Sequence, residues 1–183
     1  MRGMVNTNLV DNNILWKYIS NLQNEFKYGG YLSAVGAPSL VATVSLIMGV
    51  STNVPMLVLS YLVPLIIYSF DYYKDLDKDM ATNLERSSHL KKKSRIYPYI
   101  LGSYVFTLSI LLIKYANFSM IIFILVLALG GILYSTAFKK ITKKIPIFKN
   151  VYTVISWALF TTFFIPLYYS LNISIGYFLI FLF

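Results

Sequence analysis

The charged residues of this 183-residue chain are few and clustered, and they leave long stretches without any charge. The uncharged stretches are residues 28–70, 96–113, 117–138 and 150–183. A helix needs about 20 consecutive apolar residues to cross the hydrocarbon core of a bilayer, so each stretch is long enough for one crossing or two. Hydrophobic residues make up 57% of the chain, which is too large a share for a soluble domain. We therefore predict an all-α fold, a polytopic transmembrane helical bundle.

Five full spans and a short sixth segment are predicted within these stretches. The first stretch is too long for one helix and breaks at a turn-forming cluster, residues 51–55. The predicted spans of this single transmembrane domain, residues 1–183, are residues 31–50, 54–73, 96–113, 118–136 and 151–168. The last segment, residues 171–183, reaches only about 20 Å as a helix, which is less than the roughly 30 Å of the hydrocarbon core. We expect the chain to be the front part of a longer protein; the alternatives are that this segment is re-entrant or is completed by a partner.

The N-terminal segment, residues 1–27, carries apolar side chains at roughly helical spacing beside polar neighbours. These side chains are Ile14, Leu15, Tyr18, Ile19, Leu22 and Phe26. An amphipathic helix of this kind lies in the membrane interface with its apolar face among the lipids. We therefore predict a cytoplasmic interfacial arm.

The basic residues, which give the chain a net charge of +9, alternate with the predicted spans. If the N-terminus is inside, Lys114 alone falls outside, and the inner loops hold Arg2, Lys17, Lys27, the basic residues from Lys74 to Arg95, Lys139, Lys140, Lys143, Lys144 and Lys149. This is the positive-inside pattern of an integral membrane protein, so the acidic stretch described next is predicted to face the cytoplasm. The distribution favours membrane lipids over nucleic acid as the partner, and Lys91 to Lys93 are interpreted as an anchor for anionic lipid.

An acidic stretch, residues 67–86, holds all but two of the chain's seven acidic side chains and follows the second predicted span. Asp71, Asp75 and Asp79 are spaced four apart, so they line one face if the helix continues through them. Like charges at this spacing repel one another. Their arrangement is favourable when a cation lies between them, and carboxylates combined with substrate phosphates suit Mg²⁺. The alternative is a solvated helix end whose carboxylates pair with Lys74 and Lys78.

A second polar constellation closes the fourth predicted span on the same side of the membrane. It contains Tyr134 and Lys139, and Lys149 and Asn150 follow before the fifth span. Carboxylates that hold Mg²⁺ and lysines that neutralise oxygen anions are the groups needed to bind and release a diphosphate. An apolar bundle would shelter a hydrocarbon tail, and aromatic faces would stabilise an allylic cation. Tyr134 fits an interfacial aromatic belt equally well.

The acidic stretch resembles the first motif of the UbiA-type intramembrane prenyltransferases, Asn-x-x-x-Asp-x-x-x-Asp at the cytoplasmic end of the second helix. Asp75 and Asp79 match this spacing, and Asp71 stands where the family usually has Asn. The family often continues into Pro-x-Arg-Pro, which this chain matches only at Arg86. The family's Tyr-Ser-x-x-x-Lys stretch is similar to Tyr134 to Lys139, and Lys149 with Asn150 resembles its Lys-Asn before the fifth helix.

The resemblance implies Mg²⁺-dependent transfer of a prenyl chain from an allylic prenyl diphosphate to an aromatic or lipid acceptor. The chain would then be the N-terminal two-thirds of a nine-helix bundle. The resemblance assigns no catalytic base. It implies Asp71, Asp75 and Asp79 as metal ligands, and Arg86, Tyr134, Lys139, Lys149 and Asn150 as substrate-binding residues.

The chain also departs from this family, because no acidic residue follows Glu85 and a second Asp-rich motif is absent. The alternative function is therefore a truncated, non-catalytic membrane subunit or remnant of such an enzyme. A CDP-alcohol phosphotransferase ranks lower, because residues 71–79 lack that family's Asp-Gly and Ala-Arg elements. His89, the single histidine, is interpreted as a solvated loop residue.

Overall fold

The computed structural model describes the backbone of residues 7–172 and the side chains of that range except at residues 7–14, 139, 140, 143 and 146. The elements of this part of the chain are α1 (Thr7–Tyr28), α2 (Tyr31–Ala34), α3 (Gly36–Ile47), α4 (Val54–Lys74), α5 (Leu76–Asp79), α6 (Leu84–Lys91), α7 (Tyr97–Tyr115), α8 (Phe118–Leu133), the π-helix η1 (Tyr134–Phe138), α9 (Lys139–Lys144) and α10 (Pro146–Tyr168). The described residues contain no β-strand, so the prediction of an all-α bundle is confirmed. The predicted sixth segment lies outside the described residues from residue 173 onward.

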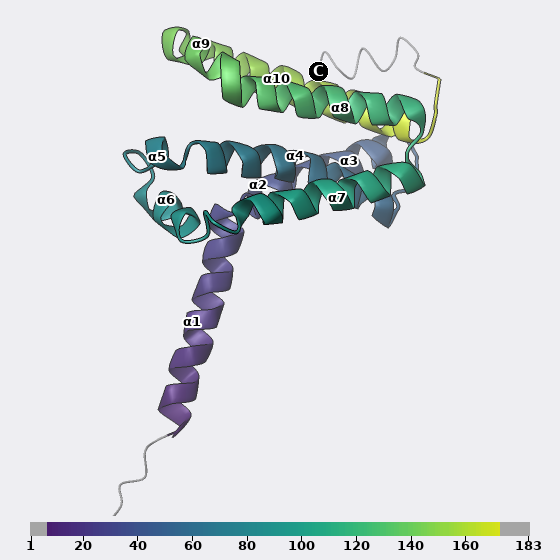
Figure 1. Cartoon of the computed structure of the whole chain (residues 1–183). Coiled ribbons are helices and arrows are strands. Elements are labelled where there is room, and N and C mark those ends of the chain that lie inside the picture. The colour runs from purple at the N-terminus through teal and green to yellow at the C-terminus, as the bar shows by residue number, and fades with distance from the viewer. Residues whose placement is uncertain (1–6, 173–183) are drawn as a thin grey trace, which may run out of the picture.

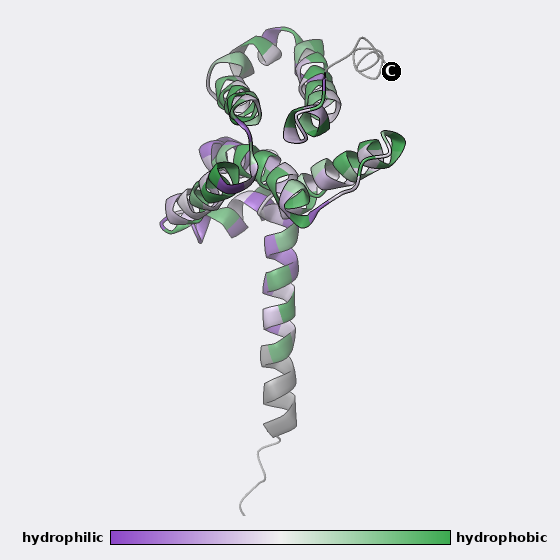
Figure 2. Ribbon diagram, turned by 90° about the vertical axis from the view of Figure 1, so that its right-hand side faces the viewer, coloured by the Kyte–Doolittle hydropathy of each residue, from purple (hydrophilic) through white to green (hydrophobic). Residues whose placement is uncertain are grey.

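Helix α4 is the central helix of the bundle and packs against α2, α3, α7 and α8. Within its most apolar window 44% of the residues are buried, whereas the share is 17% for α7 and for α8 with η1. Helices α8 and α10 form one layer over a second layer of α3, α4 and α7 (Figures 1 and 2). The core between the layers includes Val41, Leu59, Leu108, Ile124 and Phe164.

Within residues 7–172, four helices are long and apolar enough to cross a membrane, namely α4, α7, α8 continued by η1, and α10. A fifth candidate is a bent pair formed by Leu15–Tyr28 and Tyr31–Ile47. The predicted first span, residues 31–50, corresponds to α2 and α3. These two helices are long enough to be a candidate span only when the adjoining part of α1 is included. The predicted polytopic transmembrane architecture therefore agrees with the structure.

Two glycines set the bend of 50° between α1 and the helices that follow it. Gly30 has a φ angle of 88°, in the left-handed region that glycine adopts without a steric penalty. A Cβ on Gly29 would lie 2.7 Å from the carbonyl oxygen of Glu25, so a side chain is excluded there as well. Helix α1 consequently projects away from the bundle as an arm (Figure 1).

Two segments that the sequence predicted as loops contain short helices, and this part of the prediction was wrong. Helices α5 and α6 lie in the loop after the second span, and α6 begins where the Asn83 side chain accepts a hydrogen bond from the backbone N–H of Arg86, at 3.2 Å. Helix α9 lies in the second loop, and α10 begins at Pro146 instead of Val151. Proline is favoured at the first helical position because its missing N–H would have no partner there. Local signals therefore account for the starts of α6 and α10, whereas no side-chain hydrogen bond caps the start of α5 or α9.

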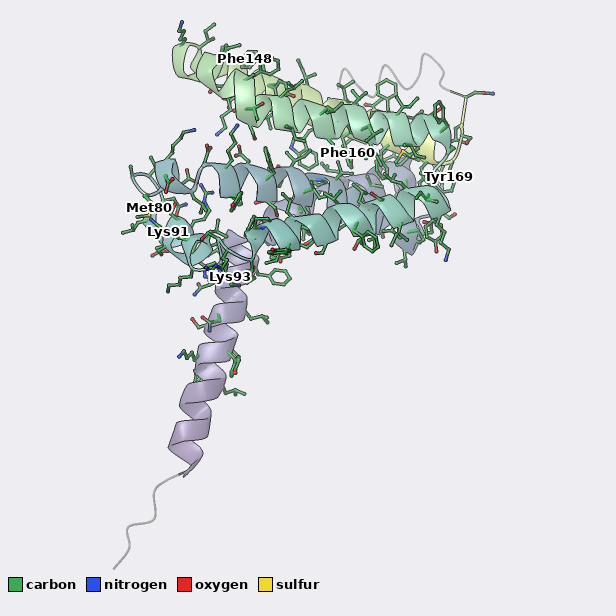
Figure 3. All side chains as sticks on the ribbon, viewed as in Figure 1. Met80, Lys91, Lys93, Phe148, Phe160 and Tyr169 are labelled. Carbon is green, nitrogen blue, oxygen red and sulfur yellow. The ribbon has the colours of Figure 1, made fainter. Side chains whose placement is uncertain are left out.

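The two ends of the bundle differ in polarity. The basic helices α6 and α9 lie at one end, near Met80, Lys91 and Lys93 (Figures 1 and 3). At the other end the Tyr169 hydroxyl donates to the Ser51 carbonyl at 2.6 Å. The described charges thus follow the partition that the positive-inside pattern predicts. Which end faces the cytoplasm stays a prediction.

The arm is joined to α6 by a cluster of ionisable side chains. The Glu25 carboxylate lies 2.9 Å from Nε2 of His89 and also pairs with Lys93. The Tyr28 hydroxyl donates to Glu85 at 2.5 Å. The prediction that His89 is solvated was wrong, because only 14% of its side chain is exposed at this joint. Tertiary packing of α1 on α6 buries it.

We expect the joint between α1 and α6 to weaken in acid. Partial burial raises the pKa of the Glu25 carboxyl, but the hydrogen bonds and charges of Lys93 and His89 outweigh it, so the pKa lies below its ordinary value of 4.5. A carboxyl with a lowered pKa stabilises the fold above its unfolded-state pKa and loses this effect as the pH falls through the folded value. Thermal unfolding of wild type and Glu25→Gln should therefore differ at neutral pH and converge below about 4.5. A difference that persisted in acid would contradict this assignment.

Close packing of α4 on α8 depends on the absence of a side chain at Gly131. A Cβ there would lie 2.7–2.9 Å from three side-chain atoms of Ile67. We expect Gly131→Ala to lower the free energy of unfolding by about 1–3 kcal/mol, as overpacking does, and Ile67→Ala to remove most of this effect in the double variant. Gly102→Ala is the matched control, because nothing lies within 4 Å of a Cβ at that position. Thermal denaturation in detergent measures the effect, and equal losses at the two glycines would exclude it.

Candidate functional site

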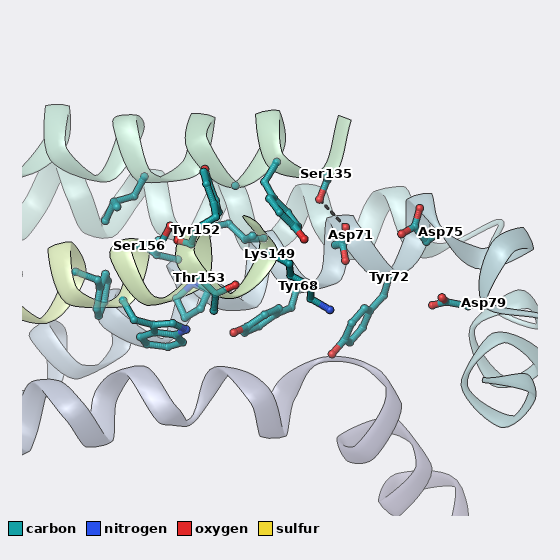
Figure 4. A pocket seen from close by; sticks show the side chains of 18 of the residues that line it. Tyr68, Asp71, Tyr72, Asp75, Asp79, Ser135, Lys149, Tyr152, Thr153 and Ser156 are labelled. Atoms are coloured by element: carbon teal, nitrogen blue, oxygen red, sulfur yellow. Dashed lines mark hydrogen bonds between the residues drawn. The ribbon is translucent and has the colours of Figure 1, made fainter. Parts of the chain in front are cut away.

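A cavity of about 460 Å³ opens between α4 on one side and α8, η1 and α10 on the other. Its volume falls within the range of about 300–1,000 Å³ that is usual for ligand pockets. Charged side chains gather at the end near α5 and α6, and apolar and aromatic side chains line the interior (Figure 4). The cavity therefore has a charged rim and an apolar interior.

The acidic part of the rim comes from the end of α4 and from α5. Helix α4 ends at Lys74 and α5 begins at Leu76, so the helix does not continue unbroken through the three carboxylates but is interrupted at Asp75. The helical hydrogen-bond pattern nevertheless carries across, because the N–H of Asp75 donates to the carbonyl of Asp71 at 3.0 Å and that of Asp79 to the carbonyl of Asp75 at 2.8 Å. All three carboxylates consequently line one cavity. Asp77 is exposed and is absent from the lining.

Each rim carboxylate has a different partner. The Ser135 hydroxyl donates to Oδ1 of Asp71 at 2.6 Å, which ties η1 to α4. Asp75 is buried and forms an ion pair with Lys78 at 3.2 Å. Asp79 pairs with Arg86. The alternative interpretation, a solvated helix end, predicted that the carboxylates pair with Lys74 and Lys78. The pair with Lys78 is present, but the Asp75 carboxylate is buried and not solvated.

Arg86 is the cation most firmly placed at the rim. Its guanidinium carbon lies 4.4 Å from the centre of the Tyr72 ring, and its side chain is 22% exposed. Its Nε is buried and has no hydrogen-bond partner among the described residues. A buried donor without a partner carries a desolvation cost. An anion at the rim would satisfy this donor.

Helix α10 supplies much of the opposite wall. Its lining residues are Lys149, Tyr152, Thr153, Ser156, Trp157 and Phe160. These positions recur every three or four residues, so they form one face of the helix. Of these lining residues the sequence-based prediction included Lys149 alone. The other lining residues of α10 could have been identified from the sequence, because they follow Lys149 at intervals of three or four residues.

Aromatic rings line the cavity between the charged rim and its apolar interior. The rings of Tyr68 and Tyr72, both on α4, stack on each other with their centroids 6.3 Å apart. The rings of Tyr134 and Tyr152 stack with their centroids 5.0 Å apart. The two tyrosines of α4 were missed by sequence reasoning. Tyr68 lies about one helical turn before Asp71, and Tyr72 lies about one turn before Asp75. Tyr134 lines the cavity and is partly buried.

The remaining predicted site residues are placed less centrally. Asn150 lies in the first part of α10, is exposed and does not line the cavity. Lys139 begins α9, and its side chain lies outside the described side chains. The structure thus brings six of the eight predicted residues to one cavity, namely Asp71, Asp75, Asp79, Arg86, Tyr134 and Lys149.

The fit of the rim to Mg²⁺ can be judged from its donor set. Among the described residues, no three acidic or histidine side chains converge closely enough to hold one metal ion. Mg²⁺ is usually bound through one or two carboxylates together with substrate phosphates and waters, not by an all-protein cage. A row of carboxylates along a rim therefore fits an ion that binds together with a phosphorylated ligand.

Comparisons with known proteins add no relative of the chain. No family model, no curated protein and no solved structure matches it. The resemblance described above rests on the residues themselves.

Removal of the Ser135 hydroxyl should destabilise the contact between η1 and α4. A hydrogen bond to a charged group contributes about 1.5–3 kcal/mol, so we expect Ser135→Ala to lower the free energy of unfolding by that amount. Thr136→Ala is the matched control, because the exposed Thr136 hydroxyl bonds only within its own helix, to the carbonyls of Ile132 and Leu133. Chemical or thermal denaturation of both variants in detergent is the measurement. Equal effects at the two positions would show that the Asp71 contact contributes nothing.

Proposed function

We propose that the chain binds an allylic prenyl diphosphate, with its diphosphate at the charged rim and its hydrocarbon chain in the cavity, and transfers the prenyl group to an aromatic or lipid acceptor. The observation that carries the proposal is the cavity itself, which combines three carboxylates and two cations at one end with an apolar interior. A ligand that fits it has a strongly charged head and an apolar tail. A prenyl diphosphate has both.

The charges at the rim favour a diphosphate that is accompanied by a divalent cation. The described lining holds Asp71, Asp75 and Asp79 against Arg86 and Lys149, so it is not positive enough to attract a diphosphate alone. Mg²⁺ bound to carboxylates and phosphate oxygens would neutralise the charge that develops on the leaving group. Arg86 and Lys149 would contact the remaining oxygens, and the Arg86 Nε would gain an acceptor.

The interior of the cavity suits the carbon side of such a reaction. As the bond between C1 and the diphosphate oxygen breaks, the diphosphate leaves with the electron pair and C1 gains allylic cation character. The nearby faces of Tyr68 and Tyr134 would stabilise this positive charge, whereas the Tyr72 ring already faces the Arg86 guanidinium. The acceptor then forms a bond to C1 and loses a proton. An apolar lining that excludes water protects the cation from hydrolysis.

A second candidate function is a membrane subunit that binds the diphosphate without turning it over. It is favoured by one observation, the presence of a single acid-rich motif and no acidic residue after Glu85. Both candidates predict binding, but only the first predicts release of inorganic diphosphate from the bound ligand when membranes containing acceptor lipids are added.

Binding of geranylgeranyl diphosphate to the purified chain in detergent tests the proposed site. We expect binding only in the presence of Mg²⁺, and we expect Asp75→Asn to weaken it by about tenfold or more, equivalent to at least about 1.4 kcal/mol. Asp77→Asn is the matched control, since it makes the same change in charge at an exposed residue outside the cavity lining. Isothermal titration calorimetry gives both affinities. Binding that needs no divalent cation and is unchanged in Asp75→Asn would overturn the proposal.

A further inference from the structure

We infer that α1 and the basic segment that follows α6 form one docking surface for a membrane leaflet that contains anionic phospholipid. This surface lies outside the cavity and is independent of the proposed transfer reaction. The arm and the basic segment are distant in sequence, and the structure places them side by side. Its two components are an apolar face on the arm and exposed lysine and arginine side chains beside it.

The apolar face of α1 has no protein partner over most of its length among the described residues. Leu15, Ile19, Leu22 and Phe26 recur at helical spacing, so they form one stripe along α1. All four are exposed, Leu15 to 60% and Leu22 to 68%. Trp16 lies at the edge of this stripe and is also exposed. A helix with one apolar stripe and aromatic side chains at its border is suited to the membrane interface.

Continuity with the bundle identifies lipid, and not another protein, as the occupant of this stripe. Phe26 packs on Tyr31 with ring centroids 5.6 Å apart, and Tyr31 packs in turn on the hydrophobic core. The helices that follow expose Leu32, Leu46 and Ile47. The stripe is therefore joined at Tyr31 to apolar surface on the candidate spans, which lies against hydrocarbon once the bundle is in a membrane.

The charges beside the stripe determine which lipid it prefers. Lys91, Lys92 and Arg95 are exposed at the end of α6 and in the turn that follows, and Lys17 and Lys27 are exposed on α1. A basic residue close to an anionic membrane surface contributes about 1 kcal/mol, which is roughly a fivefold change in partitioning. Lys17 lies on the opposite face of α1 from the stripe, and Lys27 pairs with Glu85. Lys91, Lys92 and Arg95 are therefore the cations that would raise the affinity of the arm for an anionic leaflet.

The joint between α1 and α6 holds the two components of the surface together. Glu25 pairs with His89 and Lys93, so the charge of Lys93 is already neutralised, and Lys91, Lys92 and Arg95 are left for contact with lipid. Glu85 is exposed and opposes anion binding locally, although Lys27 lies 3.8 Å from it. The net effect is a positive surface whose position relative to the arm is fixed by the partly buried side chains of Glu25, His89 and Lys93.

Trp16 provides a direct reporter of the docking. The chain has two tryptophans, so Trp157→Phe leaves Trp16 as the single fluorophore. The full chain is reconstituted in nanodiscs of phosphatidylcholine alone or of phosphatidylcholine with phosphatidylglycerol, each with brominated acyl chains. We expect stronger quenching of Trp16 in the anionic discs, and we expect Ile19→Ser with Leu22→Ser to reduce it. The quenched fraction gives the equilibrium constant for seating of the arm.

Removal of charge separates electrostatic docking from a purely apolar contact. The exposed substitutions Lys91→Gln, Lys92→Gln and Arg95→Gln should each lower the seating constant in anionic discs by about fivefold and leave it unchanged in neutral discs. Lys114→Gln is the control, because it removes one charge at the opposite end of the bundle. Circular dichroism verifies that each variant remains helical.

Two outcomes would overturn the inference. Equal quenching in neutral and anionic discs, unchanged by the charge substitutions, would show that the lysines and arginine do not contact the leaflet. Absence of quenching in every disc would show that the arm stays in water or docks on a protein. Because no prenyl diphosphate is used, these results do not depend on the proposed function.

Discussion

The packing of α4 between its neighbours is the interaction on which the rest of the structure depends. The apolar residues of α4 hold the two layers together, and its last turn carries the carboxylate that begins the charged rim. The same helix therefore determines both the core and the position of the site. At Gly131 the side chain of Ile67 from α4 packs so closely on α8 that a Cβ has no room there, as is common where small residues pack in membrane bundles.

The rim places acidic side chains at the boundary of an apolar bundle, and the structure balances them locally. Ser135, Lys78 and Arg86 each contact a different carboxylate, and they come from three different elements. Mutual repulsion of the acids is thereby offset before any ligand arrives. A ligand at the rim would either displace these three contacts or add to them. Its binding free energy therefore depends on how many of the three contacts it displaces.

The sequence predicted the features that follow from hydrophobic length and helical period. The position of α4 and the shared face of Asp71, Asp75 and Asp79 were predictable, because they depend on contacts between residues near one another in the chain. The helical period also extends to the lining of α10, once Lys149 is taken as its start. The partners of Asp71 and Glu25 were not predictable, because Ser135 and His89 are 64 residues away from them and are brought close only by tertiary packing. The polar helices α5, α6 and α9 were missed because they carry no long apolar pattern, and of the three α6 alone has a side-chain cap, at Asn83.

The contact between η1 and α4 has a mechanical consequence. Lys74 donates to the carbonyl of Ser135 at 2.9 Å, and the hydroxyl of the same serine donates to Asp71. Asp71 thus connects the two layers through its hydrogen bond with Ser135, and it is also part of the rim. A ligand that binds the Asp71 carboxylate would weaken its contact with Ser135. Ligand binding at the rim would therefore change the backbone mobility of η1.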